Sequence, residues 1–243
     1  MNSGGVRRFG VTEAHDVPGP LLVPAEPSVS LVVNLSGPVA GFVTAAGRTY
    51  RSAAPAAPGP RAWATLTLSP PDAYRVLGVA PDRPVLALED VLGTAGRDLA
   101  ERLREAGDFT AMEAFLRERL ASGRPPAPEV VRAWRRLAAS GGRVPVRLLA
   151  EEVGWSHQHL TRMFHRQLGR PPKTLARLLR LRVALRRMRE DTWQAAVAAG
   201  YFDEAHFARD LREFTGSTPG RYLREALPCG CVQSLQDGPS AAS

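Results

Sequence analysis

The spacing of apolar residues changes once along the chain, from alternation to a helical period. Short apolar or β-branched runs, separated by glycine and proline, occupy residues 21–23, 29–35, 39–44 and 63–68. Runs of this kind between turn residues are typical of strands. Residues 73–79 are predicted as one more strand, and 81–92 as a connector. The pattern therefore predicts a small, irregular antiparallel β unit over about residues 21–80.

From Ala95 onward the apolar residues recur at intervals of three and four, as they do on one face of a helix. One predicted helix ends at Gly107 and a second at Gly123, which places a helical pair at about 95–122. The pair either packs on the β unit or forms a dimer surface. After a proline-rich stretch every segment has the helical pattern, with predicted helices at 129–139, 145–153, 156–168, 172–189, 192–199, 203–215 and 219–226.

These patterns predict an α+β chain of two domains. Residues 1–123 are expected to form an N-terminal unit, which could mediate dimerisation, and 124–128 a linker. Residues 129–227 form an all-α domain of seven helices, and 228–243 a flexible tail.

The all-α domain contains an internal repeat. The segments LLAEEVGWSHQHLTRMFHRQLGRPP (148–172) and AAVAAGYFDEAHFARDLREFTGSTP (195–219) align, with one extra residue in the second turn. In each, a short helix, a Gly-aromatic turn and a longer helix follow one another. Gly154 and Gly200 suit the left-handed conformation that ends a helix, and Ser156 and Asp203 are good N-caps. Each copy is therefore predicted to be a helix-turn-helix.

The charge of the chain lies in this repeat-bearing domain. Residues 1–127 have no net charge, whereas 128–227 carry +9. A basic domain beside a neutral one is expected when only one of them meets a polyanion. The second helix of each copy has an apolar side and an Arg-bearing polar side. Arginine can donate two hydrogen bonds to guanine, and glutamine can pair with adenine, so this face suits the major groove of DNA.

Residues 128–226 resemble the DNA-binding domain of AraC/XylS-type transcription regulators, most specifically in GYFDEAHFARDLREFTGSTPGRYL (200–223). The resemblance implies a tandem helix-turn-helix domain whose two recognition helices enter successive major grooves on one face of DNA. The family's base-contacting positions correspond to Gln158, Thr161, Arg162, Glu204, Ala205, His206 and Arg209. Because Glu204 repels phosphates, we expect the first unit to dominate specificity and Arg209 to be the strongest base contact of the second.

Polar side chains and helix N-termini around the two units are candidates for phosphate contacts, which position a protein without specifying sequence. They are Ser156, Arg166, Arg170, Lys173, Thr174, Thr218 and Arg221.

The N-terminal half resembles the sensor-like regions that precede this domain in some actinobacterial AraC-like proteins, mainly through residues 85–93. Many family members hold a cupin-like effector pocket there, but this half lacks the clustered ligands of a metal cupin. The aromatic residues Phe42, Tyr50, Trp63 and Tyr74 either line a ligand pocket or pack the β unit.

Other chemistry has little support in the sequence. His157 and His159 point about 200° apart on a helix and make a poor metal chelate. Cys229 and Cys231 lie in the tail and are either an inert pair or a reactive thiol site. No phosphate loop, nucleophile elbow or zinc-protease motif is present. No catalytic residue, metal or cofactor is therefore predicted.

The sequence thus predicts a cytoplasmic, nucleoid-associated regulator that binds double-stranded promoter or operator DNA and is not an enzyme. RNA polymerase, a small-molecule effector and a second copy of the chain are candidate partners. A membrane is not a candidate partner, because no apolar run approaches the roughly 18–20 residues that a transmembrane helix needs. Two alternatives stay open: a DNA-tethered enzyme using Glu13, His15, Asp16 or Glu26 in a mobile leader, and a non-specific architectural protein. Activation and repression are not distinguished.

Overall fold

The structure is a computed structural model, and it describes residues 8–14, 22–23, 25–35, 41–47, 50–51, 61–81, 83–106, 109–187 and 192–226. The N-terminal elements are β1 (Arg8–Ala14), β2 (Leu22–Val23), β3 (Val29–Asn34), β4 (Gly41–Thr44), β5 (Tyr50–Arg51), β6 (Arg61–Leu68), α1 (Pro70–Leu77), β7 (Val85–Ala87), α2 (Leu88–Leu92), α3 (Thr94–Ala106) and α4 (Thr110–Ser122). The C-terminal elements are α5 (Pro128–Ala139), α6 (Val146–Glu152), α7 (His157–Leu168), α8 (Pro172–Arg187), α9 (Thr192–Ala198), α10 (Glu204–Thr215) and α11 (Pro219–Ala226).

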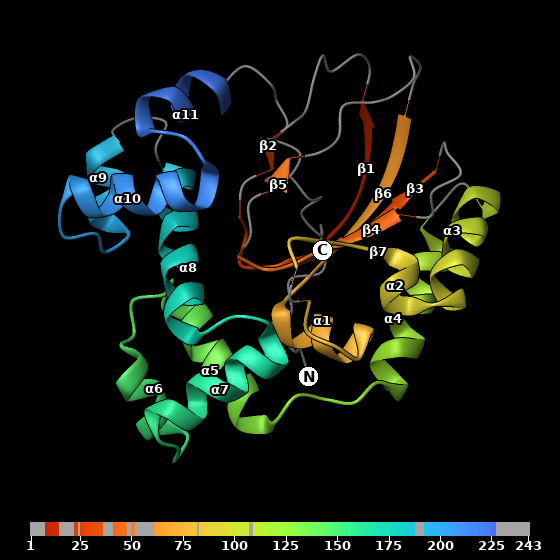
Figure 1. Cartoon of the computed structure of the whole chain (residues 1–243), viewed down its shortest axis with the longest axis horizontal. Coiled ribbons are helices and arrows are strands. Elements are labelled where there is room, and N and C mark those ends of the chain that lie inside the picture. The colour runs from red at the N-terminus through yellow and green to blue at the C-terminus, as the bar shows by residue number, and fades with distance from the viewer. Residues whose placement is uncertain are drawn as a thin grey trace, which may run out of the picture.

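The N-terminal unit is built on an antiparallel sheet with strand order β1-β6-β3-β4-β7, beside a two-stranded pair of β2 and β5. At its centre Leu31 of β3 lies opposite both Val43 of β4 and Leu66 of β6. All three side chains are fully buried. Burial alternates along β3, because successive side chains of a strand point to opposite faces. The sheet therefore has one apolar face, which α1 and the helices α2–α4 flank in Figure 1.

Three expectations for the N-terminal unit are wrong. Residues 73–79 are not a strand, because Ser69 caps a helix whose first two residues are proline and whose C-cap, Gly78, is left-handed. The predicted connector 81–92 contains the edge strand β7 and the short helix α2. The expected mobile leader contains β1, in which Glu13 pairs with Ala62 of β6. His15 and Asp16 lie outside the described residues.

The predicted helical pair is confirmed as α3 and α4, which pack against each other. Helix α4 also packs on α1, where Arg119 donates a hydrogen bond from Nε to the carbonyl oxygen of Val76 at 2.7 Å. Of the four aromatic residues proposed for a pocket, Phe42 and Trp63 pack edge to face, with ring centroids 5.9 Å apart. Tyr74 lies on α1, and the side chain of Tyr50 is outside the described part of the chain.

All seven predicted C-terminal helices are present, as α5 to α11. In Figure 1, α8 runs between a lower group, α5–α7, and an upper group, α9–α11. The tail 228–243, with Cys229 and Cys231, lies outside the described residues, as do 188–191.

The two units are in direct contact. Arg170, just after α7, donates from Nε to the carbonyl oxygen of Ala46 at 3.0 Å. The amide of Ala25 donates to the carbonyl oxygen of Phe214, in the last turn of α10, at 2.8 Å. Helix α1 packs against α7 and α5. The N-terminal unit therefore touches the C-terminal ends of both α7 and α10.

Candidate nucleic-acid interface

Two helix-turn-helix units, α6–α7 and α9–α10, form the core of the C-terminal half. Both turns contain a glycine with positive φ, +74° at Gly154 and +92° at Gly200, a conformation in which a Cβ is strained. The second helices are capped alike. Ser156 Oγ accepts from the amide of His159 at 3.2 Å, and Asp203 Oδ1 from the amide of His206 at 2.6 Å. The turn chemistry that the sequence predicts is therefore confirmed in both copies.

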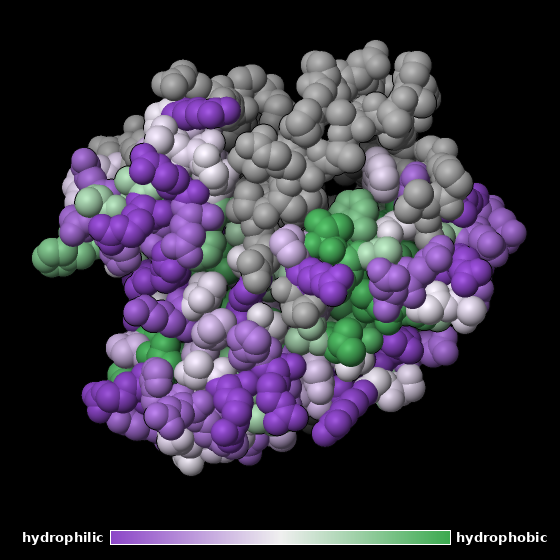
Figure 2. Space-filling view, viewed as in Figure 1, coloured by the Kyte–Doolittle hydropathy of each residue, from purple (hydrophilic) through white to green (hydrophobic). Residues whose placement is uncertain are grey.

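The apolar sides of α7 and α10 are buried as the repeat requires. The fully or almost fully buried side chains are Leu160, Phe164, Leu168, Phe207, Leu211 and Phe214. Their burial fixes which sides of the two helices face solvent. Figure 2 shows that hydrophilic side chains dominate the surface of this helical half.

The exposed side of α7 carries Gln158 and Arg162, and Thr161 is partly buried beside them. Arg162 Nη2 donates to Nδ1 of His159 at 2.9 Å, which orients the guanidinium along the outer side of the helix. On α10, Glu204, Ala205 and Arg209 are exposed. The structure thus presents Gln158, Arg162, Ala205 and Arg209 on open surfaces.

His206, also proposed as a base contact, lies differently. Its ring packs edge to face on Tyr201, with centroids 5.1 Å apart, and its Nε2 is 3.9 Å from Asp210 Oδ2. The first unit contains the same pair, His159 against Trp155 at 4.5 Å. The imidazole of His206 is therefore directed toward the interior of its unit in this structure.

A buried ionic cluster joins α8 to α10, and the sequence analysis missed it. Asp210 is 1% exposed and accepts at Oδ1 from Nε and Nη2 of Arg177, at 3.0 and 2.6 Å. The hydroxyl of Tyr201 donates to Asp210 Oδ2 at 3.2 Å. Arg177 also pairs with Glu213 at 2.6 Å and lies 4.9 Å over the ring of Phe214. The cluster fixes the second recognition helix on the long helix.

This cluster changes the proton affinity of its members. Burial raises the pKa of Tyr201 well above its usual range, and the charge of Asp210 raises it further. Burial alone would lower the pKa of Arg177, but its hydrogen bonds to Glu213 and Asp210 outweigh that effect, so the pKa is raised. Tyr201 is thus neutral and Arg177 charged throughout the physiological range.

The candidate phosphate contacts fall into two groups. Ser156, Arg166, Lys173, Thr218 and Arg221 are exposed, and Thr174 is partly buried. Arg170 instead bonds to Ala46 of the N-terminal unit, so in this arrangement its guanidinium faces protein rather than open solvent.

The described residues hold no cluster of three or more His, Cys, Asp or Glu side chains that could bind a metal ion. Within the same part of the chain, no helix has the length and apolarity needed to cross a membrane.

A shallow depression of about 400 Å³ lies along the outer side of α10, lined by Ala205, Ala208, Arg209, Arg212 and Glu213.

Residues 149–225 match the family model of a helix-turn-helix domain. No curated protein sequence matches the chain significantly. Among solved structures, the chain is similar to ToxT from Vibrio cholerae. A 1.65 Å structure of ToxT has 10% identity and a TM-score of 0.50, over 90% of this chain and 98% of that one. A second has 10% identity and a TM-score of 0.48, over 90% and 97%.

Together, the paired helix-turn-helix units and the match over residues 149–225 make this chain a DNA-binding transcription regulator. Its helix-turn-helix domain is of the AraC type. Over 90% of its length, the chain has the two-domain fold also found in ToxT.

Proposed function

We propose that the chain is a sequence-specific regulator whose helices α7 and α10 enter successive major grooves on one face of promoter DNA. The observation that carries this proposal is the repetition of the unit: each second helix follows a turn with a positive-φ glycine, begins at a side-chain N-cap and has an exposed polar side. The 16 residues of α8 span about 24 Å at 1.5 Å per residue. That length is of the same order as the spacing of successive major grooves on one face of DNA, which is one helical turn or roughly 34 Å.

In this proposal Gln158, Thr161 and Arg162 contact bases in one groove, and Ala205 and Arg209 do so in the other. Glu204 stands at the first position of α10 and is exposed to an approaching phosphate chain. It favours a cytosine amino group over phosphate, because a carboxylate can only accept hydrogen bonds. His206 takes part after its ring leaves Tyr201. The first unit therefore supplies most of the sequence specificity.

The proposal is tested by selecting bound sites from a random DNA pool with the full chain at about 150 mM salt. We expect two short sequence blocks about one helical turn apart. Arg162→Ala should weaken the selected site by roughly 1–3 kcal/mol and relax preference at one base pair. The matched control is Arg117→Ala, which removes the same charge from an exposed position on α4. Equal weakening of every sequence by Arg162→Ala would contradict base contact, and no enrichment would favour an architectural role.

We further propose that the N-terminal unit controls DNA affinity through its contacts with the ends of α7 and α10, and that it holds the site for a small-molecule effector. The contacts of Arg170 with Ala46 and of Ala25 with Phe214 support this role. Because both recognition helices end on the same unit, a shift of that unit changes their relative position. A regulatory role of this kind, rather than catalysis, is the function we assign to residues 1–123.

Arg170 tests this second role. If it contacts a phosphate, Arg170→Ala lowers the slope of log affinity against log salt by about 0.9. If it holds the N-terminal unit, the slope stays constant and the melting temperature falls instead. We expect the second result, with Arg166→Ala as the comparison that lowers the slope, because Arg166 is exposed on α7.

A further inference from the structure

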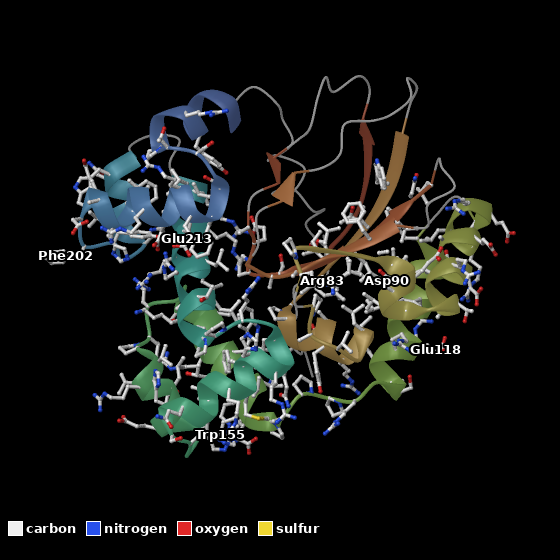
Figure 3. All side chains as sticks on the ribbon, viewed as in Figure 1. Arg83, Asp90, Glu118, Trp155, Phe202 and Glu213 are labelled. Carbon is white, nitrogen blue, oxygen red and sulfur yellow. The ribbon has the colours of Figure 1, made fainter. Side chains whose placement is uncertain are left out.

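Phe202 is the most exposed large apolar side chain in the described part of the molecule. It is 91% exposed, against 51% for Val197, which is next. Figure 3 shows it projecting away from the second helix-turn-helix unit. It lies between Tyr201 and the N-cap Asp203, and it has no counterpart in the first unit, where the cap Ser156 follows Trp155 directly. Phe202 is the extra residue of the second turn.

Folding of the unit does not explain this residue. An apolar side chain just before an N-cap usually packs on the fourth residue of the helix, here Phe207. Tyr201 occupies that place instead, with its ring 5.2 Å from that of Phe207 and its hydroxyl on Asp210. The insertion thus adds an aromatic ring to the surface at the start of α10 without adding one to the core.

The surroundings of Phe202 define the chemistry that it can meet. The next exposed side chains along α10 are Glu204, which repels phosphate oxygens, and Ala205, which is small and apolar. The depression on the same helix is lined by two alanines, Ala205 and Ala208, together with the charged side chains of Arg209, Arg212 and Glu213. The apolar group that the major groove offers is the C5 methyl of thymine, which alanine and phenylalanine contact in protein–DNA complexes.

We infer that Phe202, together with Ala205, binds thymine methyl groups in the half-site of the second unit. The inference rests on the proposed function, because it requires α10 to enter a major groove. It gives the second unit a means of recognising A·T pairs by apolar contact where Glu204 disfavours ionic contact. Arg209, one turn further along α10, then contacts the neighbouring base pair.

The test replaces each thymine of the selected site in turn with deoxyuridine, which lacks only the methyl group. We expect one or two positions in the second half-site at which the wild-type chain loses about fourfold in affinity per methyl removed. Phe202→Ala should bind the thymine site several-fold more weakly and show no further loss with deoxyuridine there. Phe202→Leu, which keeps an apolar side chain, should retain the difference between thymine and deoxyuridine.

Val197→Ala is the matched control, since it shortens the next most exposed apolar side chain of the same unit, on α9. It should leave the response to deoxyuridine unchanged. Melting temperatures should agree among all four proteins, because neither side chain is buried.

Three results would overturn the inference. These are equal wild-type binding to thymine and deoxyuridine sites, a deoxyuridine loss that persists in Phe202→Ala, and unchanged DNA affinity in Phe202→Ala. The last result would leave Phe202 as a surface for a protein partner. Failure of the proposed function is distinguishable, because then no site is selected or Arg162→Ala changes no base preference, and the inference falls with it.

Discussion

Two carboxylates bind the same guanidinium in this protein, and their different burial predicts very different contributions to stability. Asp210 and Glu213 both approach Arg177 Nη2 at 2.6 Å. The side chain of Asp210 is 1% exposed, whereas that of Glu213 is 51% exposed. Because the two N···O distances are equal and only the burial of the carboxylates differs, a difference in stability between the variants reports the effect of solvent rather than of distance. The pair Asp210→Ala and Glu213→Ala is therefore an internal comparison.

Removal of the Asp210 carboxylate takes a hydrogen-bond acceptor from two groups. The Tyr201 hydroxyl loses its acceptor, and Arg177, itself 20% exposed, keeps only Glu213. Breaking a buried ion pair costs about 3–5 kcal/mol. Because Glu213 still compensates the guanidinium, we expect the lower end, about 3 kcal/mol. For a chain of this size that corresponds to a fall in melting temperature of about 6–12 °C. Glu213→Ala should cost less than about 1 kcal/mol, because water screens an exposed pair.

The measurement is urea unfolding of both variants and the wild type, followed by far-ultraviolet circular dichroism, with thermal melts in parallel. A cost for Asp210→Ala within about 0.5 kcal/mol of that for Glu213→Ala would refute the reasoning. Burial of the carboxylate would then have no measurable consequence, and the anchoring of α10 on α8 would rest on apolar packing alone.

Three further predictions concern turns, pH and capping. Gly169 and Gly154 have φ of +75° and +74°, but a Cβ at Gly169 would lie 2.7 Å from the carbonyl oxygen of Pro81, whereas Gly154 is open. Both alanine variants should lose about 1 kcal/mol from backbone strain, and only Gly169→Ala should lose more in urea unfolding. Folding raises the pKa of Tyr201, so above about pH 10 the unfolded chain loses the phenol proton while the folded chain keeps it. The contribution of Tyr201 to the free energy of unfolding is therefore complete below pH 10 and falls above it by at most about 1.4 kcal/mol per pH unit. Tyr201→Phe should lack this part of the fall in urea midpoints between about pH 9 and 11. Ser156→Ala should cost about 1 kcal/mol in thermal unfolding, through loss of the cap on the amide of His159.

The C-terminal half is predictable from sequence because its signals are local. A helix is marked by residues three and four apart, by a cap at one end and by a glycine at the other, so all seven helices follow from neighbouring residues. The same signals in the second copy confirm those in the first. Exposure of Gln158, Arg162 and Arg209 follows from the helical period alone.

The sequence predictions are wrong or incomplete mainly where the structure depends on contacts between residues far apart in the chain. Strand β1 depends on pairing with β6, some 50 residues away, and its own sequence has no strong apolar alternation. Residues 73–77 form a short, mainly apolar run, interrupted by Arg75, in which periodicity cannot separate helix from strand. The cap at Ser69 and the prolines after it were the usable signal. Arg177 and Asp210 lie on different helices and are 33 residues apart in the chain, so no local sequence spacing predicts their ion pair.

The two recognition helices are held in different ways, and this difference bears on how the N-terminal unit acts. Helix α10 is fixed to α8 by the buried carboxylate of Asp210, independently of residues 1–123. Helix α7 has no such ion pair among the described residues. It packs on α5, α6 and α8 of its own half and on α1 of the N-terminal unit, and Gln167 Oε1 accepts from the amide of Ala127 just before α5. We therefore expect displacement of the N-terminal unit to act first on α7, the helix that carries Gln158 and Arg162. The unit that we propose as the main source of base specificity is thus also the one that packs on helix α1 of the N-terminal half.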